Sequence, residues 1–260
     1  MSGHIRLIVV FGLAIVMLVV LLPIHLLALL FAKLGWVRPA GTIPVIFHRV
    51  LLKLFGVRLT VKGNLERSRP LLLVANHVSW LDIPVLGALA PLSFVAKSEM
   101  RSWPLFGNLA RLQRTVFVER NLRRTAQIQA NEVAERMTAR EIMVLFPEGT
   151  TSDGNRLLPF KTPIFEASKI ALAASPVEQA MVQPIAVHYT HLHGLPLGRA
   201  DRPHVAWPGE VGLAESLLPL VARGALDVTL HLGEPIPLTE TSNRKIVAAQ
   251  SAQSIRDLMV

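Results

Sequence analysis

The chain has 260 residues, of which 51% are hydrophobic and 17% are charged, and its mean hydropathy is +0.44. This composition excludes disorder, and the absence of cysteine excludes a disulfide scaffold, a thiol nucleophile and cysteine-ligated metal sites. The net charge is +9, and the first 65 residues hold seven basic groups and no Asp or Glu. The remaining residues include 20 basic and 18 acidic ones, so most of the excess positive charge lies in the first 65 residues. This distribution favours an anionic membrane over nucleic acid as the partner.

The amino-terminal segment is strongly apolar, with 26 residues from Leu7 to Ala32 that carry no formal charge. A continuous helix of this length would measure about 39 Å, enough to cross a hydrocarbon core of about 30 Å. Pro23 and His25 interrupt the run, so an in-plane or re-entrant helix pair is the alternative to a spanning helix. A signal peptide is disfavoured because the run is long and no small-residue cleavage site follows it.

Residues 43–55 form a basic amphipathic pattern, in which one side carries Ile43, Phe47, Val50 and Leu54. Contact with a membrane surface and simple packing on the rest of the chain both explain it. The basic residues after the apolar run place the large carboxyl-terminal part on the cytoplasmic side of the inner membrane. We therefore expect a membrane-associated helical segment at 1–55 and one α/β domain at 56–260.

After Gly56 the pattern changes to short apolar runs that alternate with helical stretches. The expected strands are 57–62, 71–75, 93–96, 115–118, 142–146, 182–188 and 226–232, and the expected helices are 80–89, 104–112, 123–139, 164–173 and 243–259. Strands that alternate with helices of this length predict a layered α/β domain.

The first chemical motif is Asn-His-Val-Ser-Trp-Leu-Asp, which follows the strand at 71–75 and contains His77 and Asp82. On a continuous helix the two side chains would point about 140° apart. They can meet only if His77 lies in the loop after the strand while Asp82 lies in the first helical turn. The Asp could then orient the His as a base towards a hydroxyl. A capping box of Ser79 and Asp82 is the purely structural alternative.

Further polar residues fall at or shortly after the ends of other expected strands. They are Lys97, Arg120, Glu148 with Gly149, and Lys161. In an open α/β sheet, ligands bind at the edge where strands end and loops begin. Arg and Lys at such an edge suit an anionic group.

Four ordered blocks between residues 70 and 190 resemble the glycerolipid acyltransferase family typified by 1-acyl-sn-glycerol-3-phosphate acyltransferase. They are the His-x4-Asp block at 76–82, Val-Phe-Val-Glu-Arg at 116–120, Phe-Pro-Glu-Gly-Thr at 146–150 and Val-Gln-Pro-Ile at 182–185. The resemblance implies a mixed sheet flanked by helices, preceded by amino-terminal membrane helices. It also implies transfer of an acyl chain from acyl carrier protein or coenzyme A to a lysolipid, with no metal or cofactor.

The resemblance implies a role for each matching residue. His77 would deprotonate the acceptor hydroxyl and Asp82 would orient His77. Arg120 would hold the phosphate of the acceptor, and Glu148 and Gly149 would shape the acceptor site. Backbone amides around Gly149 are candidates for the oxyanion donors.

Two lysolipids are candidates for the acceptor of the acyl chain. The favoured one is 1-acylglycerol 3-phosphate, which yields phosphatidic acid. The segment after Phe160-Lys161 departs from the family's usual Lys-Lys-Gly, and the 149–161 loop and the later Ala-Trp-Pro-Gly-Glu at 206–210 resemble lyso-ornithine lipid acyltransferases. That acceptor is zwitterionic and lacks a phosphate for Arg120. Two other classes remain as alternatives: a catalytically silent lipid-binding protein, and a hydrolase of a lipid ester or thioester.

Overall fold

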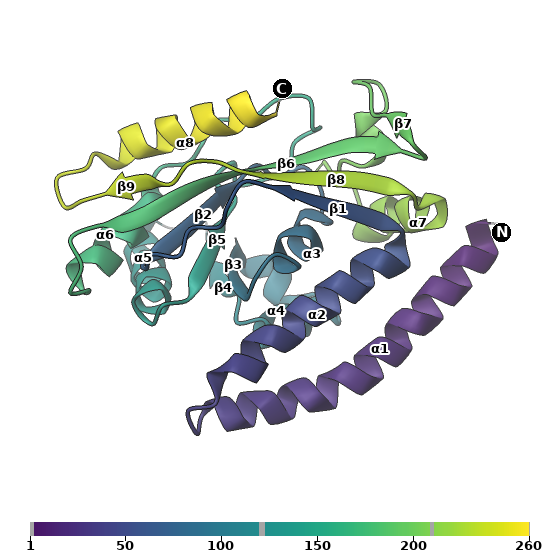
Figure 1. The fold of residues 1–260 in the computed structure, drawn as a ribbon, viewed down its shortest axis with the longest axis horizontal. Coiled ribbons are helices and arrows are strands. Elements are labelled where there is room, and N and C mark those ends of the chain that lie inside the picture. The colour runs from purple at the N-terminus through teal and green to yellow at the C-terminus, as the bar shows by residue number, and fades with distance from the viewer. Residues whose placement is uncertain (1–2, 120–122, 209–210, 260) are drawn as a thin grey trace.

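The computed structural model describes residues 3–119, 123–208 and 211–259, and within them nine strands form one mixed sheet (Figure 1). The strands are β1 (Val57–Lys62), β2 (Leu71–Ala75), β3 (Leu92–Lys97), β4 (Val116–Val118), β5 (Ile142–Leu145), β6 (Ala180–Leu192), β7 (Leu195–Pro196), β8 (Leu226–Leu232) and β9 (Ile236–Leu238). The main order is β1-β8-β6-β2-β5-β3-β4, and β7 and β9 also pair with β6.

The helices surround this sheet. They are α1 (Gly3–Ala32), α2 (Val37–Phe55), α3 (Asp82–Gly87), α4 (Phe106–Leu112), α5 (Arg123–Thr138), α6 (Glu166–Ala173), α7 (Leu213–Arg223) and α8 (Arg244–Leu258). Short 3-10 helices lie at η1 (Ser98–Ser102), η2 (Pro163–Phe165) and η3 (Arg202–His204). All seven predicted strands and five predicted helices of the α/β part are present. The sequence reasoning missed β7, β9 and α7, and α7 carries Pro219 in its interior, which disfavours a helix.

The central strands run in one direction. β2 pairs in parallel with both β5 and β6, β5 pairs in parallel with β3, and β3 pairs in parallel with β4. The strands β2, β3, β4 and β5 therefore end at the same edge of the sheet, which is where the predicted polar residues follow them.

Helices cover both faces of the sheet and enclose two apolar cores. One core joins the sheet to α1, α2, α3 and α7, and the other joins it to α5, α6 and α8. The strand β2 contributes to both, because Leu71 and Leu73 point to the first face while Leu72 and Val74 point to the second. This explains why the strand is apolar throughout.

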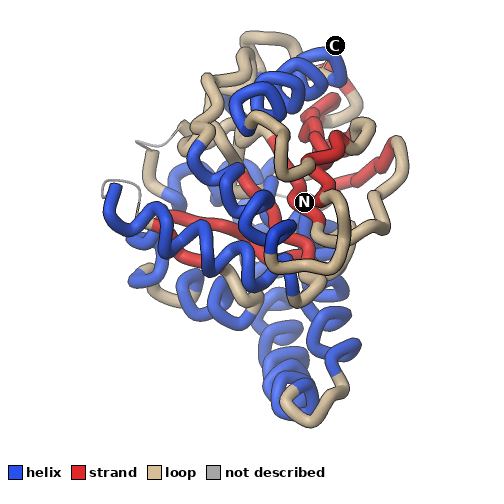
Figure 2. The backbone as a smooth tube through the Cα atoms, turned by 90° about the vertical axis from the view of Figure 1, so that its left-hand side faces the viewer, coloured by secondary structure: helices blue, strands red, loops and turns tan. Residues whose placement is uncertain are grey.

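The amino-terminal helices form a hairpin whose turn extends away from the sheet, at the bottom of Figures 1 and 2. The helix α1 continues through Pro23, and among the described residues it alone is long and apolar enough to cross a membrane. The covered side of α2 is Val45, His48, Leu52 and Phe55, whereas Val50 is exposed. The apolar side predicted for residues 43–55 is therefore not the side that is buried. The buried side is set by the three elements that α2 packs against, which are α1, α3 and β1.

Candidate active site

The Asn-His-x4-Asp segment forms the loop that joins β2 to α3. The side chain of Asn76 holds this loop to β6, because its Nδ2 donates to the Val187 carbonyl at 3.0 Å and its Oδ1 accepts from the Val187 amide at 2.7 Å. His77 lies in the loop, and Asp82 begins α3. The geometry predicted from the spacing is therefore confirmed.

The side chains of His77 and Asp82 form a hydrogen-bonded pair. The His77 Nδ1 donates to the Asp82 Oδ2 at 2.7 Å, so the lone pair of the neutral ring lies on Nε2. The Asp82 side chain is 0% exposed and that of His77 is 17% exposed. The imidazole also stacks on Phe146, with ring centroids 4.0 Å apart and planes at 17°. The ring is thus held by two neighbours, and its Nε2 is the nitrogen available to a substrate hydroxyl.

The carboxylate of Asp82 receives three further hydrogen bonds. Its Oδ2 accepts from the backbone amides of Val78 at 2.7 Å and Ser79 at 2.9 Å, and its Oδ1 accepts from the Tyr189 hydroxyl at 2.5 Å. Asp82 therefore binds the backbone amides of the helix start and orients His77 at the same time. Burial and the nearby Asp82 charge raise the pKa of Tyr189 well above its usual value, so this phenol stays a donor.

The Phe-Pro-Glu-Gly-Thr block follows β5 and supports the His77 loop from the other side. The buried Glu148 accepts from the His77 amide through Oε1 at 2.6 Å and from the Leu158 amide through Oε2 at 2.8 Å. Burial raises the pKa of Glu148 to about 7 despite these two donors, and the negative charge of Asp82 adds to the effect. Glu148 thus connects three segments: the His77 loop, the end of β5 and the 149–161 loop.

Gly149 and Lys161 lie next to each other. Gly149 has φ +78°, and a Cβ there would lie 2.8 Å from the Lys161 Nζ. The Lys161 amide donates to the Pro147 carbonyl at 2.8 Å, which draws the end of the loop back to its start. The Gly149 amide donates to the Phe146 carbonyl at 3.1 Å. That amide is therefore engaged, and an oxyanion role for the other backbone amides around Gly149 stays a prediction.

Another predicted residue, Lys97, stands apart from this group. Lys97 ends β3, which is separated from β2 by β5, so the two strands lie roughly 10 Å apart. Arg120 lies outside the described residues, and its role as an anion-binding residue stays a prediction.

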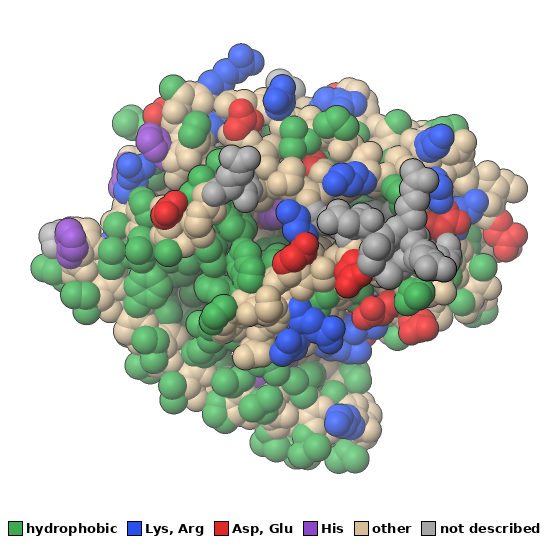
Figure 3. Space-filling view, turned by 180° about the vertical axis from the view of Figure 1, so that it is seen from behind, with side chains coloured by type: hydrophobic (Ala, Val, Ile, Leu, Met, Phe, Trp, Pro, Cys, Tyr) green, Lys and Arg blue, Asp and Glu red, His purple; other side chains and the backbone are tan. Residues whose placement is uncertain are grey.

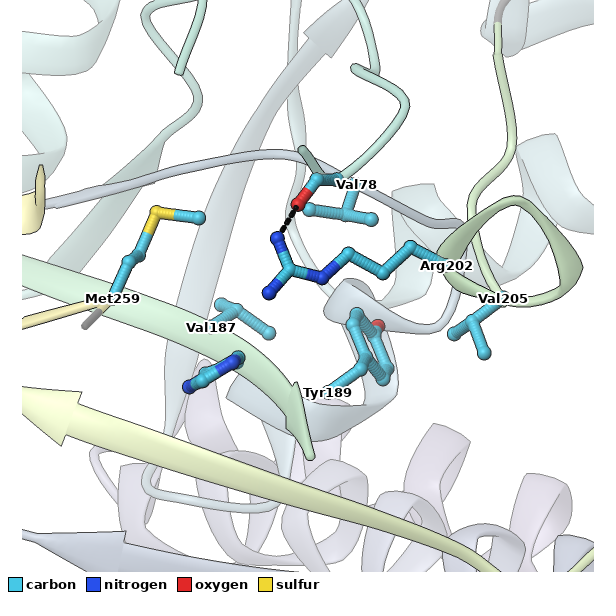
Figure 4. A pocket seen from close by; sticks show the side chains of 8 residues that line it. Val78, Val187, Tyr189, Arg202, Val205 and Met259 are labelled. Atoms are coloured by element: carbon cyan, nitrogen blue, oxygen red, sulfur yellow. Dashed lines mark hydrogen bonds between the residues drawn. The ribbon is translucent and has the colours of Figure 1, made fainter. Parts of the chain in front are cut away.

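Residues 197–208, which follow β7, close one wall of the site; the resemblance singles out the 206–210 segment, but its contact with the His77 loop is known only from the fold. The Trp207 amide donates to the Val78 carbonyl at 2.8 Å, and the Thr151 hydroxyl donates to the Trp207 carbonyl. The Trp207 ring meets Trp103 edge to face at 6.0 Å. Behind Tyr189, Arg202 donates to the Gly154 carbonyl at 3.0 Å beside a void of about 10 Å³ (Figure 4). This void has room for about one water molecule and not for a lipid chain.

The face opposite to that in Figure 1 is hollowed and largely apolar, with Lys and Arg side chains beside the hollow (Figure 3). An apolar surface with local positive charge suits an amphiphile that has an anionic or zwitterionic group. Together, the mixed sheet and a hydrogen-bonded His–Asp pair beyond the end of a parallel strand fit the α/β acyltransferase that the sequence blocks predict.

The comparisons with known proteins agree with this class. Residues 56–188 match the family model Acyltransferase, and the chain belongs to that family. A lyso-ornithine lipid O-acyltransferase of Rhizobium meliloti is 48% identical over 95% of this chain and 84% of its own length. One of Brucella abortus is 46% identical over 100% of this chain and 96% of its own length.

More distant relatives have other names. A 1-acyl-sn-glycerol-3-phosphate acyltransferase of Neisseria meningitidis is 33% identical over 83% of both chains. The crystal structure of the 1-acyl-sn-glycerophosphate acyltransferase PlsC from Thermotoga maritima has a TM-score of 0.58 and 21% identity, with 85% of this chain and 80% of that chain covered. It shares the fold, and the predicted fold class is thereby confirmed.

Proposed function

We propose that this acyltransferase acylates the free hydroxyl of a lyso-ornithine lipid. The chain is an acyltransferase that acts on lysolipids, and the proposed acceptor is supported by the two relatives with 46–48% identity over 84% and 96% of their lengths. The sequence motifs alone favoured 1-acylglycerol 3-phosphate. That acceptor becomes the second candidate, supported by the relative with 33% identity.

The single observation that carries the chemistry is the His77–Asp82 pair. In the proposed mechanism the His77 Nε2 takes the proton of the acceptor hydroxyl while that oxygen attacks the carbonyl carbon of an acyl thioester. The tetrahedral intermediate then expels the thiolate, which receives the proton from His77. The acyl group moves directly to the acceptor, without an acyl-enzyme intermediate. The negative charge of Asp82, at 2.7 Å, stabilises the imidazolium form of His77 between the two steps.

Lys161 is the cation proposed to recognise the acceptor. Its ammonium lies beside the backbone of Gly149 and its side chain is exposed. A single ammonium suits the carboxylate of an ornithine head group, which carries no phosphate. Arg120 and Lys97 would add positive charge at the same edge of the sheet.

A competition assay tests the acceptor and the chemistry together. Lyso-ornithine lipid and 1-acylglycerol 3-phosphate are mixed in detergent micelles with labelled acyl–acyl carrier protein or acyl–coenzyme A, and His77→Ala is the blank. We expect labelled ornithine lipid from the wild-type protein and none from the blank. If labelled phosphatidic acid is the only product, the acceptor is 1-acylglycerol 3-phosphate and not lyso-ornithine lipid. Equal turnover by His77→Ala would refute the mechanism, and no product from either acceptor would favour a silent lipid-binding protein.

We further propose that residues 1–55 attach the protein to the cytoplasmic face of the inner membrane without spanning it. Two contacts of α1 support this topology. Arg6 donates to the Val221 carbonyl at 2.8 Å and to the Phe55 carbonyl at 3.0 Å, and the His25 Nε2 donates to the Leu112 carbonyl at 3.1 Å. These contacts are 19 residues apart, or about 28 Å along the helix, yet both reach the α/β domain. A spanning helix would have one of these ends across the bilayer.

Cysteine labelling tests the topology, since the natural chain has no cysteine. His4→Cys and Lys33→Cys place one thiol near each end of α1. We expect a membrane-impermeant maleimide to label neither in intact spheroplasts and both after lysis. Labelling of either thiol from outside would refute the monotopic arrangement.

A further inference from the structure

The structure contains a second, larger groove, between α2 and the edge strand β1. Its volume is about 710 Å³, within the range of about 300–1,000 Å³ that is usual for ligand sites. Its walls are the carboxyl-terminal half of α2, β1, the residues that follow α3 and the start of β8. In the sheet order β1 is separated from β2 by β8 and β6, or roughly 14 Å, so the groove is distinct from the His77 site.

The lining of this groove carries more positive than negative charge. Within the described part of the chain, its lining holds the cations Arg49, Lys53 and Arg58 against the one carboxylate of Asp227. The Arg58–Asp227 pair is loose, at 3.7 Å, and the Arg58 side chain is 80% exposed. The Arg49 Nε donates to the Ala88 carbonyl at 2.8 Å, which fixes this guanidinium over the groove and uses one of its five N–H donors. An anionic group therefore finds an oriented guanidinium and an uncompensated positive charge.

The rest of the groove lining is apolar, and this limits the kinds of anion that the groove can bind. Leu52, Val57, Leu59, Val61 and Leu89 form most of it, and among the described lining residues none is aromatic. A nucleotide would use stacking side chains, whereas an acyl chain needs only aliphatic contacts. The ligand that matches both halves of the groove is an amphiphile with a negative head.

The surroundings of the groove indicate where such an amphiphile comes from. Ile46 and Val50, which are 44% and 37% exposed, lie on the same face of α2 as Arg49 and Lys53. They add to the exposed apolar side chains of the neighbouring helix α1, which lipid would cover. The groove therefore opens where the proposed membrane surface meets the sheet.

We infer that this groove binds one anionic phospholipid of the host membrane, with its phosphodiester over Arg49, Lys53 and Arg58 and an acyl chain against Leu59 and Leu89. The bound lipid would bridge α2 and β1 and so fix the orientation of the α/β domain on the bilayer. The inference rests on the proposed membrane attachment and not on the identity of the acceptor.

Native mass spectrometry of the full chain in a neutral detergent tests this inference. Phosphatidylglycerol and phosphatidylcholine with identical acyl chains are titrated against the wild-type protein, the double variant Lys53→Glu/Arg58→Glu and the matched control Lys33→Glu/Arg38→Glu. The control makes the same charge change at exposed residues outside the groove. Leu59→Trp narrows the groove without changing charge, and thermal unfolding checks that each variant is folded.

We expect one tightly held phosphatidylglycerol and weaker phosphatidylcholine on the wild-type protein. The groove variant should lose affinity by at least about thirtyfold, since the loss of two cations alone predicts about that much and both are replaced by carboxylates. Leu59→Trp should weaken both lipids, and the control should bind as the wild type does. An equal loss in the control, equal binding of the two lipids, or displacement of the lipid by glycerol 3-phosphate at the same concentration would overturn the inference.

The acyl-transfer assay on the same wild-type preparation separates this inference from the proposed function. A protein that transfers acyl groups but does not distinguish the two lipids refutes the groove alone. A protein that holds phosphatidylglycerol as expected but forms no acylated product supports the groove and refutes the proposed function.

Discussion

Replacement of Asp82 by asparagine separates the charge of this residue from its hydrogen bonds. In Asp82→Asn the side-chain oxygen can still accept from the backbone amides of Val78 and Ser79, and the new amide can donate to the Tyr189 oxygen. The His77 Nδ1 also keeps an acceptor. We therefore expect the loop to keep its conformation while the negative charge beside His77 is lost.

The size of the effect follows from the geometry. The charge centres of protonated His77 and Asp82, joined by a 2.7 Å hydrogen bond, lie about 4 Å apart and attract each other by about 4 kcal/mol at an effective dielectric constant of about 20. Since about 1.4 kcal/mol changes a rate tenfold, the loss of this attraction predicts a decrease of about a thousandfold in kcat.

The assay is the initial rate of acyl transfer in micelles at saturating donor, with thermal unfolding measured in parallel. We expect the unfolding temperature to stay close to that of the wild type, because every buried polar partner keeps a hydrogen bond. A folded variant that retains more than about a tenth of the wild-type kcat would refute the electrostatic role of Asp82.

Three further substitutions test the supports of this pair. Tyr189→Phe removes the donor to Asp82, so we expect unfolding to become easier by about 1.5–3 kcal/mol while kcat falls far less than in Asp82→Asn; an equal fall in kcat would contradict this. Because the folded-state pKa of Glu148, about 7, lies above its ordinary 4.5, its contribution to stability is complete below pH 4.5 and is lost as pH rises through 7. Glu148→Gln should therefore reduce the fall in the free energy of unfolding between pH 5.5 and 8.5 by about 2 kcal/mol, as followed by the melting temperature. An unchanged pH dependence would assign the fall to other groups. Gly149→Ala should reduce acyl transfer and stability together, since φ is +78° there and the new Cβ would meet the Lys161 Nζ at 2.8 Å; wild-type values of both would show that the turn tolerates a side chain.

The sequence predicted the parts of the site that depend on local order along the chain. The five-residue spacing of His77 and Asp82 is informative because only a loop followed by a helix start brings them together, and the structure has that arrangement. The ends of β2 and β5 could be placed for a similar reason, since both strands are apolar throughout and buried on both faces.

The parts that sequence reasoning missed depend on contacts between distant segments. Tyr189 reaches Asp82 across 107 residues of chain, and the hydrogen bond of Trp207 to the His77 loop likewise joins segments far apart in the chain. Tyr189 is the one tyrosine of the chain, but nothing in its local sequence indicates that it points towards the site. Glu148 was predicted as a site residue, whereas its bonds to two backbone amides could be known only from the fold.

The docking of Arg6 has a consequence for the order in which the protein assembles. Its partner Val221 is 215 residues further along the chain, and Val10, one turn beyond Arg6, is buried in the same core. At about 5–20 residues per second, roughly 10–40 s of synthesis separate the two segments. The apolar helix α1 therefore leaves the ribosome with its partner α2, but long before α7, the other helix that it packs against, exists. Lipid is available to cover the apolar side of α1 that α2 leaves exposed, so membrane attachment should precede the completion of the α/β domain, and the nascent chain should already be at the bilayer when His77, Asp82 and Tyr189 come together.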